Sequence, residues 1–149
     1  MSKNLRLLVI HGPNINMLGT REPGIYGTAT IDEINSQIQS HAEEKGVEIS
    51  IHQSNSEGAI IDIMHEHADF DGLVINPAAY THTSIAIYDA ILACGIPAVE
   101  VHISNIHARE EFRKTSLIAP ACVGQVAGFG GYSYVIGIDA LLHYIQQNR

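Results

Sequence analysis

The sequence is poor in the residues that define several classes of protein. Its 149 residues include no tryptophan and only two cysteines, Cys94 and Cys122, both in apolar surroundings. Two such thiols cannot form the disulfide framework of a small secreted domain, and we expect them to be buried fillers in a reducing compartment. A chain of this length can bury roughly two thirds of the surface that its unfolded form exposes. We therefore expect a single domain over residues 1–149 that needs no disulfides.

Positive charge is also scarce. Eight Lys and Arg residues stand against 16 Asp and Glu residues, which gives a formal net charge of −8 and an isoelectric point near 5.5. Binding to a nucleic-acid backbone relies on clustered Lys and Arg side chains. A nucleic-acid partner is therefore not expected.

Long apolar runs are absent as well. No stretch approaches the ~20 apolar residues that a membrane-spanning helix requires. The apolar segment at residues 5–11 contains Arg6 and leads directly into an Asn, Gly and Pro turn, with no small-residue cleavage site after it. We interpret this segment as a strand, and we expect a cytoplasmic protein without a signal sequence or membrane segment.

What the sequence does contain is a regular alternation of strand and helix patterns. Short apolar or alternating runs predict strands, and apolar stripes bounded by capping residues and glycines predict helices. The predicted strands are residues 5–11, 47–53, 72–78, 97–103 and 124–130, and the predicted helices are residues 30–46, 56–69, 83–95, 108–116 and 133–148. A (β/α)₈ barrel needs about 250 residues. The alternation therefore predicts an α/β fold of the flavodoxin-like type, a doubly wound five-stranded parallel sheet with helices on both faces.

Polar side chains follow the first four predicted strands. Because open parallel sheets bind ligands beyond the carboxyl ends of their strands, we expect these side chains to converge. They are Asn14, Arg21 and Tyr26 after the first strand, Asn55 after the second, Asn76, His82 and Ser84 after the third, and Glu100, His102, Ser104, Arg109 and Arg113 in and after the fourth. Cations, amides and hydroxyls suit a small carboxylic acid with several hydroxyl groups. No loop has the glycine spacing of a nucleotide-phosphate site, so no nucleotide is indicated.

The loop at residues 19–27, GTREPGIYG, places a scarce arginine beside a tyrosine. Tyrosine has an ordinary pKa near 10, so a tyrosine that acts as a base at neutral pH must ionise about 3 pH units lower. A neighbouring guanidinium favours the phenolate, which gives Arg21 a reason to lie near Tyr26. His102 and Glu100 are two residues apart in a strand and therefore face the same side, so the carboxylate can orient the imidazole.

Two alternatives compete with an acid–base enzyme. The nine histidines raise the possibility of a metal site, but His65 and His67 are two residues apart in a predicted helix and point in different directions, so no metal is predicted. The other alternative is a flavodoxin-like binding or signalling module without catalytic activity, either a flavin carrier or a phospho-acceptor receiver. A receiver would need an acidic cluster after the first strand, where His11 stands.

Three segments together resemble one enzyme family. They are residues 12–27 (GPNINMLGTREPGIYG), 76–84 (NPAAYTHTS) and 100–113 (EVHISNIHAREEFR), and their order and separations are similar to those of type II 3-dehydroquinate dehydratases. The resemblance extends to GFGGYSY at residues 128–134. The departures are conservative: Ile15 and Met17 stand where leucine is frequent, and Ala78 stands where glycine is common.

The resemblance implies a cofactor-free hydro-lyase that converts 3-dehydroquinate to 3-dehydroshikimate in the shikimate pathway, which leads to chorismate and the aromatic amino acids. The reaction is an anti elimination of water through an enolate. The resemblance implies that Tyr26 removes the proton beside the ketone and that His102 protonates the departing hydroxyl.

The same resemblance implies roles for the other candidate residues. Arg21 would be a lid arginine that keeps Tyr26 ionisable, Asn14 would stabilise the enolate through a water, and Glu100 would orient His102. The substrate-binding residues would be Asn76, Ile103 and Ser104 for the carboxylate and His82 and Arg113 for the ring hydroxyls. The resemblance also implies a homododecamer, a tetramer of trimers, in which Asp89 reaches the site of a neighbouring subunit.

Overall fold

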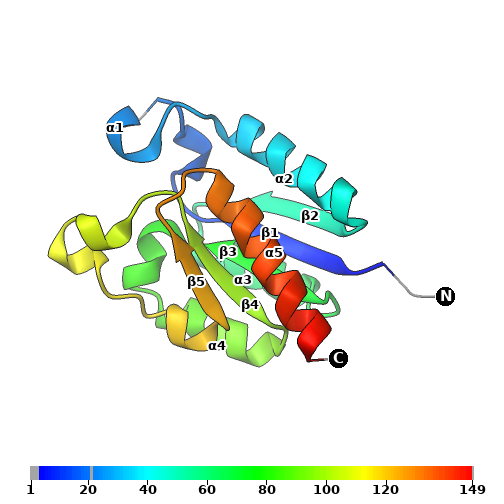
Figure 1. Ribbon diagram of the computed structural model, residues 1–149. Coiled ribbons are helices and arrows are strands. Elements are labelled where there is room, and N and C mark those ends of the chain that lie inside the picture. The colour runs from blue at the N-terminus through cyan, green and yellow to red at the C-terminus, as the bar shows by residue number, and fades with distance from the viewer. Residues whose placement is uncertain (1–3, 21, 149) are drawn as a thin grey trace.

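A five-stranded sheet forms the centre of the molecule (Figure 1). The computed structural model describes residues 4–20 and 22–148. The strands are β1 (Arg6–His11), β2 (Glu48–Gln53), β3 (Gly72–Asn76), β4 (Ala98–His102) and β5 (Gly124–Ala127). Every neighbouring pair is parallel, and the order is β2-β1-β3-β4-β5. The predicted flavodoxin-like arrangement is therefore confirmed, with its switch point between β1 and β3.

Helices cover both faces of this sheet (Figure 1). One face carries α2 (Ile31–Lys45) and α5 (Tyr132–Gln147), and the other carries α3 (Glu57–Glu66) and α4 (Ile85–Cys94). None of the helices within residues 4–20 and 22–148 is long and apolar enough to cross a membrane.

Strand β1 shows how the sequence builds two core layers at once. Leu7 and Val9 belong to the apolar cluster beneath α2 and α5, and Leu8 and Ile10 belong to the cluster beneath α3 and α4. All four side chains are fully buried. Successive side chains of a strand point to opposite faces, so a continuous apolar run is what a strand buried on both faces requires.

Hydroxyl side chains fix where three of the helices begin. Thr30, Ser56 and Ser84 each accept a hydrogen bond from the backbone N–H three residues further on, at the start of α2, α3 and α4. Gly46 ends α2 and Gly95 ends α4, both in the left-handed conformation that glycine tolerates. These caps determine where the loops leave the helices and turn toward the sheet edge.

The prediction of a helix over residues 108–116 is wrong. That stretch contributes to two short 3₁₀ turns, Ile106–Ala108 and Glu111–Arg113. The polar sequence offers no apolar stripe for packing a longer helix, and its arginines instead turn toward a pocket. A short helix that was not predicted, α1 (Pro23–Tyr26), lies inside the loop of residues 19–27 and begins with proline, which suits the first turn.

The two cysteines are free and pack against the apolar cluster beneath α3 and α4. Both are only partly buried, so the expectation of buried fillers is met only in part. Burial and the nearby Glu100 carboxylate raise the pKa of the Cys122 thiol to about 12. This thiol is therefore protonated and unreactive at neutral pH.

Candidate active site

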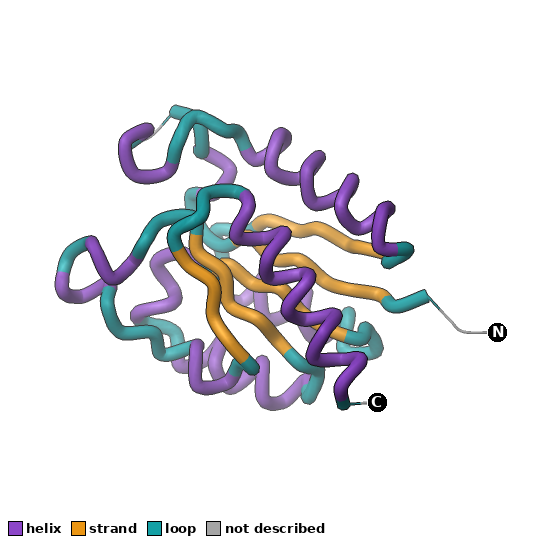
Figure 2. Tube along the Cα trace, in the orientation of Figure 1, coloured by secondary structure: helices purple, strands orange, loops and turns teal. Residues whose placement is uncertain are grey.

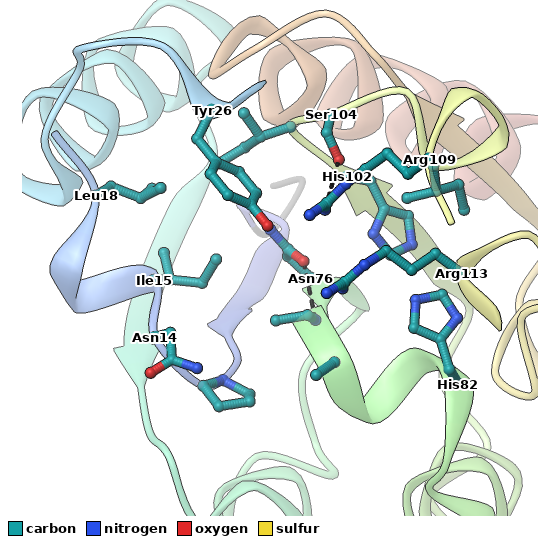
Figure 3. Close-up of a pocket in the computed structure, with 15 residues that line it drawn as sticks. Asn14, Ile15, Leu18, Tyr26, Asn76, His82, His102, Ser104, Arg109 and Arg113 are labelled. Carbon is teal, nitrogen blue, oxygen red and sulfur yellow. Dashed lines mark hydrogen bonds between the residues drawn. The ribbon is translucent and has the colours of Figure 1, made fainter. Parts of the chain in front are cut away.

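A pocket opens beyond the carboxyl ends of β1, β3 and β4, on the side where the loops gather in Figure 2. It encloses about 140 Å³. Its polar and aromatic lining residues are Asn14, Tyr26, Asn76, His82, His102, Ser104, Arg109 and Arg113, and Ile103 also lines it. Figure 3 shows Tyr26 and Asn14 on one side of the pocket and His102, Arg109, Arg113 and His82 on the other. The expected convergence of these loops is what the structure shows.

Some of the predicted site residues lie outside the pocket lining. Glu100 is fully buried behind His102, and Asp89 is exposed on α4 away from the pocket. Ser84 caps α4, and Asn55 accepts a hydrogen bond from the backbone N–H of Asn14. Arg21 lies outside the described residues, so its position relative to Tyr26 stays a prediction.

Glu100 and His102 form a buried pair at the end of β4. Glu100 Oε2 lies 2.6 Å from His102 Nε2, and the same carboxylate accepts hydrogen bonds from Ser116 Oγ and Gln125 Nε2. Burial by itself would raise the pKa of Glu100, but these hydrogen bonds, chiefly that of His102, hold it below its usual value. The ionised carboxylate therefore accepts the Nε2 proton, and Nδ1 is the His102 nitrogen that remains for a ligand.

His82 is oriented by a backbone carbonyl. Its Nδ1 lies 2.8 Å from the carbonyl oxygen of Thr115, which can only accept a hydrogen bond. The Nδ1 nitrogen therefore carries the proton, and in the neutral ring Nε2 keeps a lone pair that can accept a hydrogen bond from a ligand hydroxyl. Arg113, beside it in the pocket, pairs with Glu110 through its Nε.

Arg109 is a central pocket residue to which the sequence assigned no role. Its Cζ lies 5.0 Å from the centroid of the Tyr26 ring, and its guanidinium lies 3.5 Å from Ser104 Oγ and 3.9 Å from the Glu22 carboxylate. The side chain is 10% exposed, and Nε has no hydrogen-bond partner within the described part of the chain. A shielded guanidinium against a tyrosine face gains cation–π stabilisation. The only sequence signal for Arg109 was its place after the fourth strand.

Asn76 ends β3 and belongs to a buried polar network that the sequence did not reveal. Its Oδ1 accepts the backbone N–H of Ala78 at 3.0 Å, and its Nδ2 donates to the Tyr134 hydroxyl at 3.0 Å. That hydroxyl lies 2.7 Å from His11 Nδ1, and His11 Nε2 lies 2.7 Å from Asn35 Oδ1. The network joins β1, β3, α2 and α5 behind the pocket.

The switch-point loops approach each other closely. A Cβ at Gly12 would lie 2.6 Å from the carbonyl oxygen of Pro77, so only glycine fits where β1 meets the loop after β3. Ala78 has φ of +52°, a left-handed conformation that costs a residue with a Cβ about 1–2 kcal/mol. Ala78 is the position at which glycine is common in the family that the sequence resembles, and this conformation is one that glycine adopts without strain.

His65 and His67, the pair weighed as metal ligands, lie outside the pocket lining. His67 packs edge-on against His52 and Phe70, and its Nδ1 bonds to the carbonyl of Ile63. Over residues 4–20 and 22–148, no three His, Cys, Asp or Glu side chains gather in a way that could hold a metal ion.

Comparisons with known proteins agree on one family. The family described as dehydroquinase class II matches residues 5–142. A 3-dehydroquinate dehydratase of Geotalea daltonii is 56% identical over 144 residues, which are 96% of this chain and 100% of that protein. The crystal structure of a type II dehydroquinase from Butyrivibrio crossotus has a TM-score of 0.92 at 46% identity and covers 93% of this chain and 98% of its own. One from Propionibacterium acnes has a TM-score of 0.87 at 39% identity and covers 97% and 99%.

Proposed function

We propose that this chain, which belongs to the class II dehydroquinase family, dehydrates 3-dehydroquinate to 3-dehydroshikimate in the shikimate pathway. The observation that carries the proposal is the composition of the pocket. A tyrosine and a carboxylate-bound histidine face the same cavity, together with two arginines and two amides. An elimination needs a base for the carbon acid and an acid for the leaving hydroxyl, and this pocket offers one candidate for each.

Tyr26 and His102 are the proposed acid–base pair. Tyr26, as phenolate, takes the proton from the carbon beside the ketone and leaves an enolate, which Asn14 stabilises through a water. His102 then gives a proton to the departing C1 hydroxyl, so the C–O bond breaks, water leaves and the ring double bond forms. Because Nε2 is held by Glu100, the proton would come from Nδ1. Tyr26 gains one proton and His102 loses one, so exchange with solvent restores both.

The remaining pocket residues are proposed to bind the substrate. The carboxylate would accept hydrogen bonds from the Asn76 amide and from the Ile103–Ser104 segment, which lines the pocket directly after β4. A ring hydroxyl would donate to His82 Nε2, and Arg113 would donate to another. Each contact to a charged group contributes about 1.5–3 kcal/mol, enough to fix the ring relative to Tyr26 and His102.

Two arginines are proposed to support Tyr26. Arg109 packs over the tyrosine ring, with its Cζ 5.0 Å from the ring centroid, and would hold the ring in place. The family resemblance assigns Arg21 the task of keeping Tyr26 ionisable, as part of a loop that closes over the substrate. We also propose that the chain assembles as a homododecamer in which Asp89 contributes to a neighbouring site.

The test is an assay with pure 3-dehydroquinate and no added cofactor. The product is a conjugated enone, so absorbance in the near ultraviolet should rise with time, and a chelator should leave the rate unchanged. If folded protein at micromolar concentration caused no rise in absorbance, the proposed reaction would be refuted. Loss of the rate on chelation would favour the metal alternative, and a yellow preparation would favour a flavin carrier.

A further inference from the structure

We propose that Tyr134, His11 and Asn35 form a directed hydrogen-bond relay that holds the Asn76 amide in the orientation in which it offers an N–H to the substrate carboxylate. These three would be positioning residues, because none of them lines the pocket. The inference rests on the proposed function and deepens it, since it explains how one substrate-binding group acquires its direction.

The orientation of Asn76 is fixed first by the backbone. The N–H of Ala78 can only donate, so the Asn76 atom 3.0 Å from it must be the amide oxygen. The amide nitrogen then lies 3.0 Å from the Tyr134 hydroxyl and donates one of its two protons there. The second N–H is the donor that remains for a ligand, and Asn76 lines the pocket although it is only 3% exposed.

The direction of the relay follows from proton counting. Tyr134 has one hydroxyl proton, and because Asn76 donates to its oxygen, that proton must go to the other neighbour, His11 Nδ1. His11 Nδ1 is therefore unprotonated, and the neutral ring carries its proton on Nε2. That nitrogen lies 2.7 Å from Asn35 Oδ1, which accepts it. In this order the Tyr134 hydroxyl and both His11 ring nitrogens each have a partner.

Burial leaves little freedom in the direction of these hydrogen bonds. Tyr134 and His11 are fully buried, and a polar group that loses its partner in such a place has no water to replace it. Burial also lowers the pKa of His11 to about 4, so the imidazole stays a neutral acceptor at neutral pH. The relay thereby couples α2 and α5 to the end of β3, where Asn76 meets the pocket.

A double-mutant cycle distinguishes positioning from general support of the core. Tyr134→Phe keeps the ring and removes only the hydroxyl, so we expect KM for 3-dehydroquinate to rise about tenfold with kcat changed less than threefold. In an Asn76→Ala background the same substitution should change kcat/KM by less than twofold, because the group it positions is gone. Tyr132→Phe, the same change at an exposed site on α5, is the matched control and should match the parent.

Equal losses from Tyr134→Phe in both backgrounds, or no loss in the parent, would overturn the relay. A second measurement needs neither the variant to fold nor the enzyme to be active. Nitrogen-15 NMR of the parent protein should show His11 as the neutral tautomer protonated on Nε2 at pH 7. A proton on Nδ1, or an imidazolium, would refute the relay. If the parent protein did not turn over 3-dehydroquinate, the proposed function would fail, and the tautomer alone would decide the relay.

Discussion

At the scale of single residues, two histidines at strand ends have opposite tasks. His102 ends β4, faces the pocket and is held by the ionised Glu100 carboxylate. His11 ends β1, is fully buried and has only neutral hydrogen-bond partners, Tyr134 and Asn35. The carboxylate fixes which nitrogen of His102 faces the pocket, whereas burial lowers the pKa of His11 to about 4 and keeps its ring neutral. The same residue type can therefore serve as a proton donor in one place and as a fixed acceptor in the other.

Replacing Tyr26 by phenylalanine tests the proposed base. Without the phenolic oxygen nothing would take the proton from the substrate, so kcat should fall by about 10²–10⁴ or more. The fold should persist, because α1 has no fully buried residue. Steady-state kinetics and circular dichroism check both statements, with Tyr132→Phe as the control. A kcat within tenfold of the parent value would assign the base to another residue.

The low pKa of His11 predicts a loss of stability in mild acid. Burial, opposed in part by the hydrogen bond to Asn35, lowers this pKa from 6.5 to about 4. Between these values the unfolded chain binds a proton that the folded chain does not, so stability falls as the pH falls. At pH 5 this amounts to about 2 kcal/mol relative to pH 7.

Urea unfolding of the parent and of His11→Gln at pH 7 and pH 5 measures this loss, at one fixed protein concentration. The parent should lose about 2 kcal/mol more than the variant between the two pH values, since the other titrating groups are common to both. Equal losses in the two proteins would show that His11 is not held neutral by the fold.

At the scale of elements, helix α5 both packs in the core and supports the candidate active site. It contributes Tyr134 to the relay. It also packs closely against β3 and β4 at Gly137, which has no side chain. A Cβ at Gly137 would lie 2.7 Å from Val101 Cγ1, on a stiff β-branched side chain. Close contact of helix and sheet at this point fixes how far Tyr134 reaches toward β3.

Gly137→Ala should therefore destabilise the fold by about 1–3 kcal/mol, although alanine favours helices intrinsically. Gly58→Ala on α3 is the matched control, because the nearest atom to its new Cβ is 3.9 Å away. That change should stabilise by about 0.5–1 kcal/mol. Urea denaturation measures both, and a neutral or stabilising Gly137→Ala would show that α5 can move away from the sheet at little cost.

At the scale of the whole molecule, the described surface carries apolar side chains beside the edge strand β5. Leu92, Val123 and Tyr144 are among the exposed large apolar residues and line two neighbouring hollows there. The larger hollow encloses about 370 Å³, and its lining combines valines with polar side chains such as Gln125 and His143. Exposed apolar surface of this kind favours association with another protein surface, which agrees with the proposed assembly.

The proposed dodecamer has a definite mass. Twelve subunits of 16.2 kDa give roughly 190 kDa, which light scattering coupled to size-exclusion chromatography measures directly. We expect Asp89→Ala to impair assembly, activity or both, because the side chain is exposed in the single chain and is proposed to act in a neighbouring site. A monomer in the parent protein, or an intact variant with full activity, would contradict this proposal.

The sequence by itself determined the order of the five strands and of the four helices that cover the sheet, the flavodoxin-like class and the loops that carry the pocket. It could do so because a strand buried on both faces needs a continuous apolar run, as in β1. Helix caps such as Thr30 and Gly46 likewise depend on residues next to them in the chain. The short motifs after the strands likewise identified Tyr26, Asn76 and His102 as neighbours in space.

Only the tertiary structure decided the hydrogen-bond directions and the partners within the site. Arg109 packs on Tyr26, Gln125 holds Glu100, and Tyr134 lies 123 residues from the histidine it contacts. Such pairs depend on how the elements pack, and no local pattern in the chain encodes them. For the same reason the segment after β4 turns its arginines into the pocket instead of forming the helix that its composition suggested.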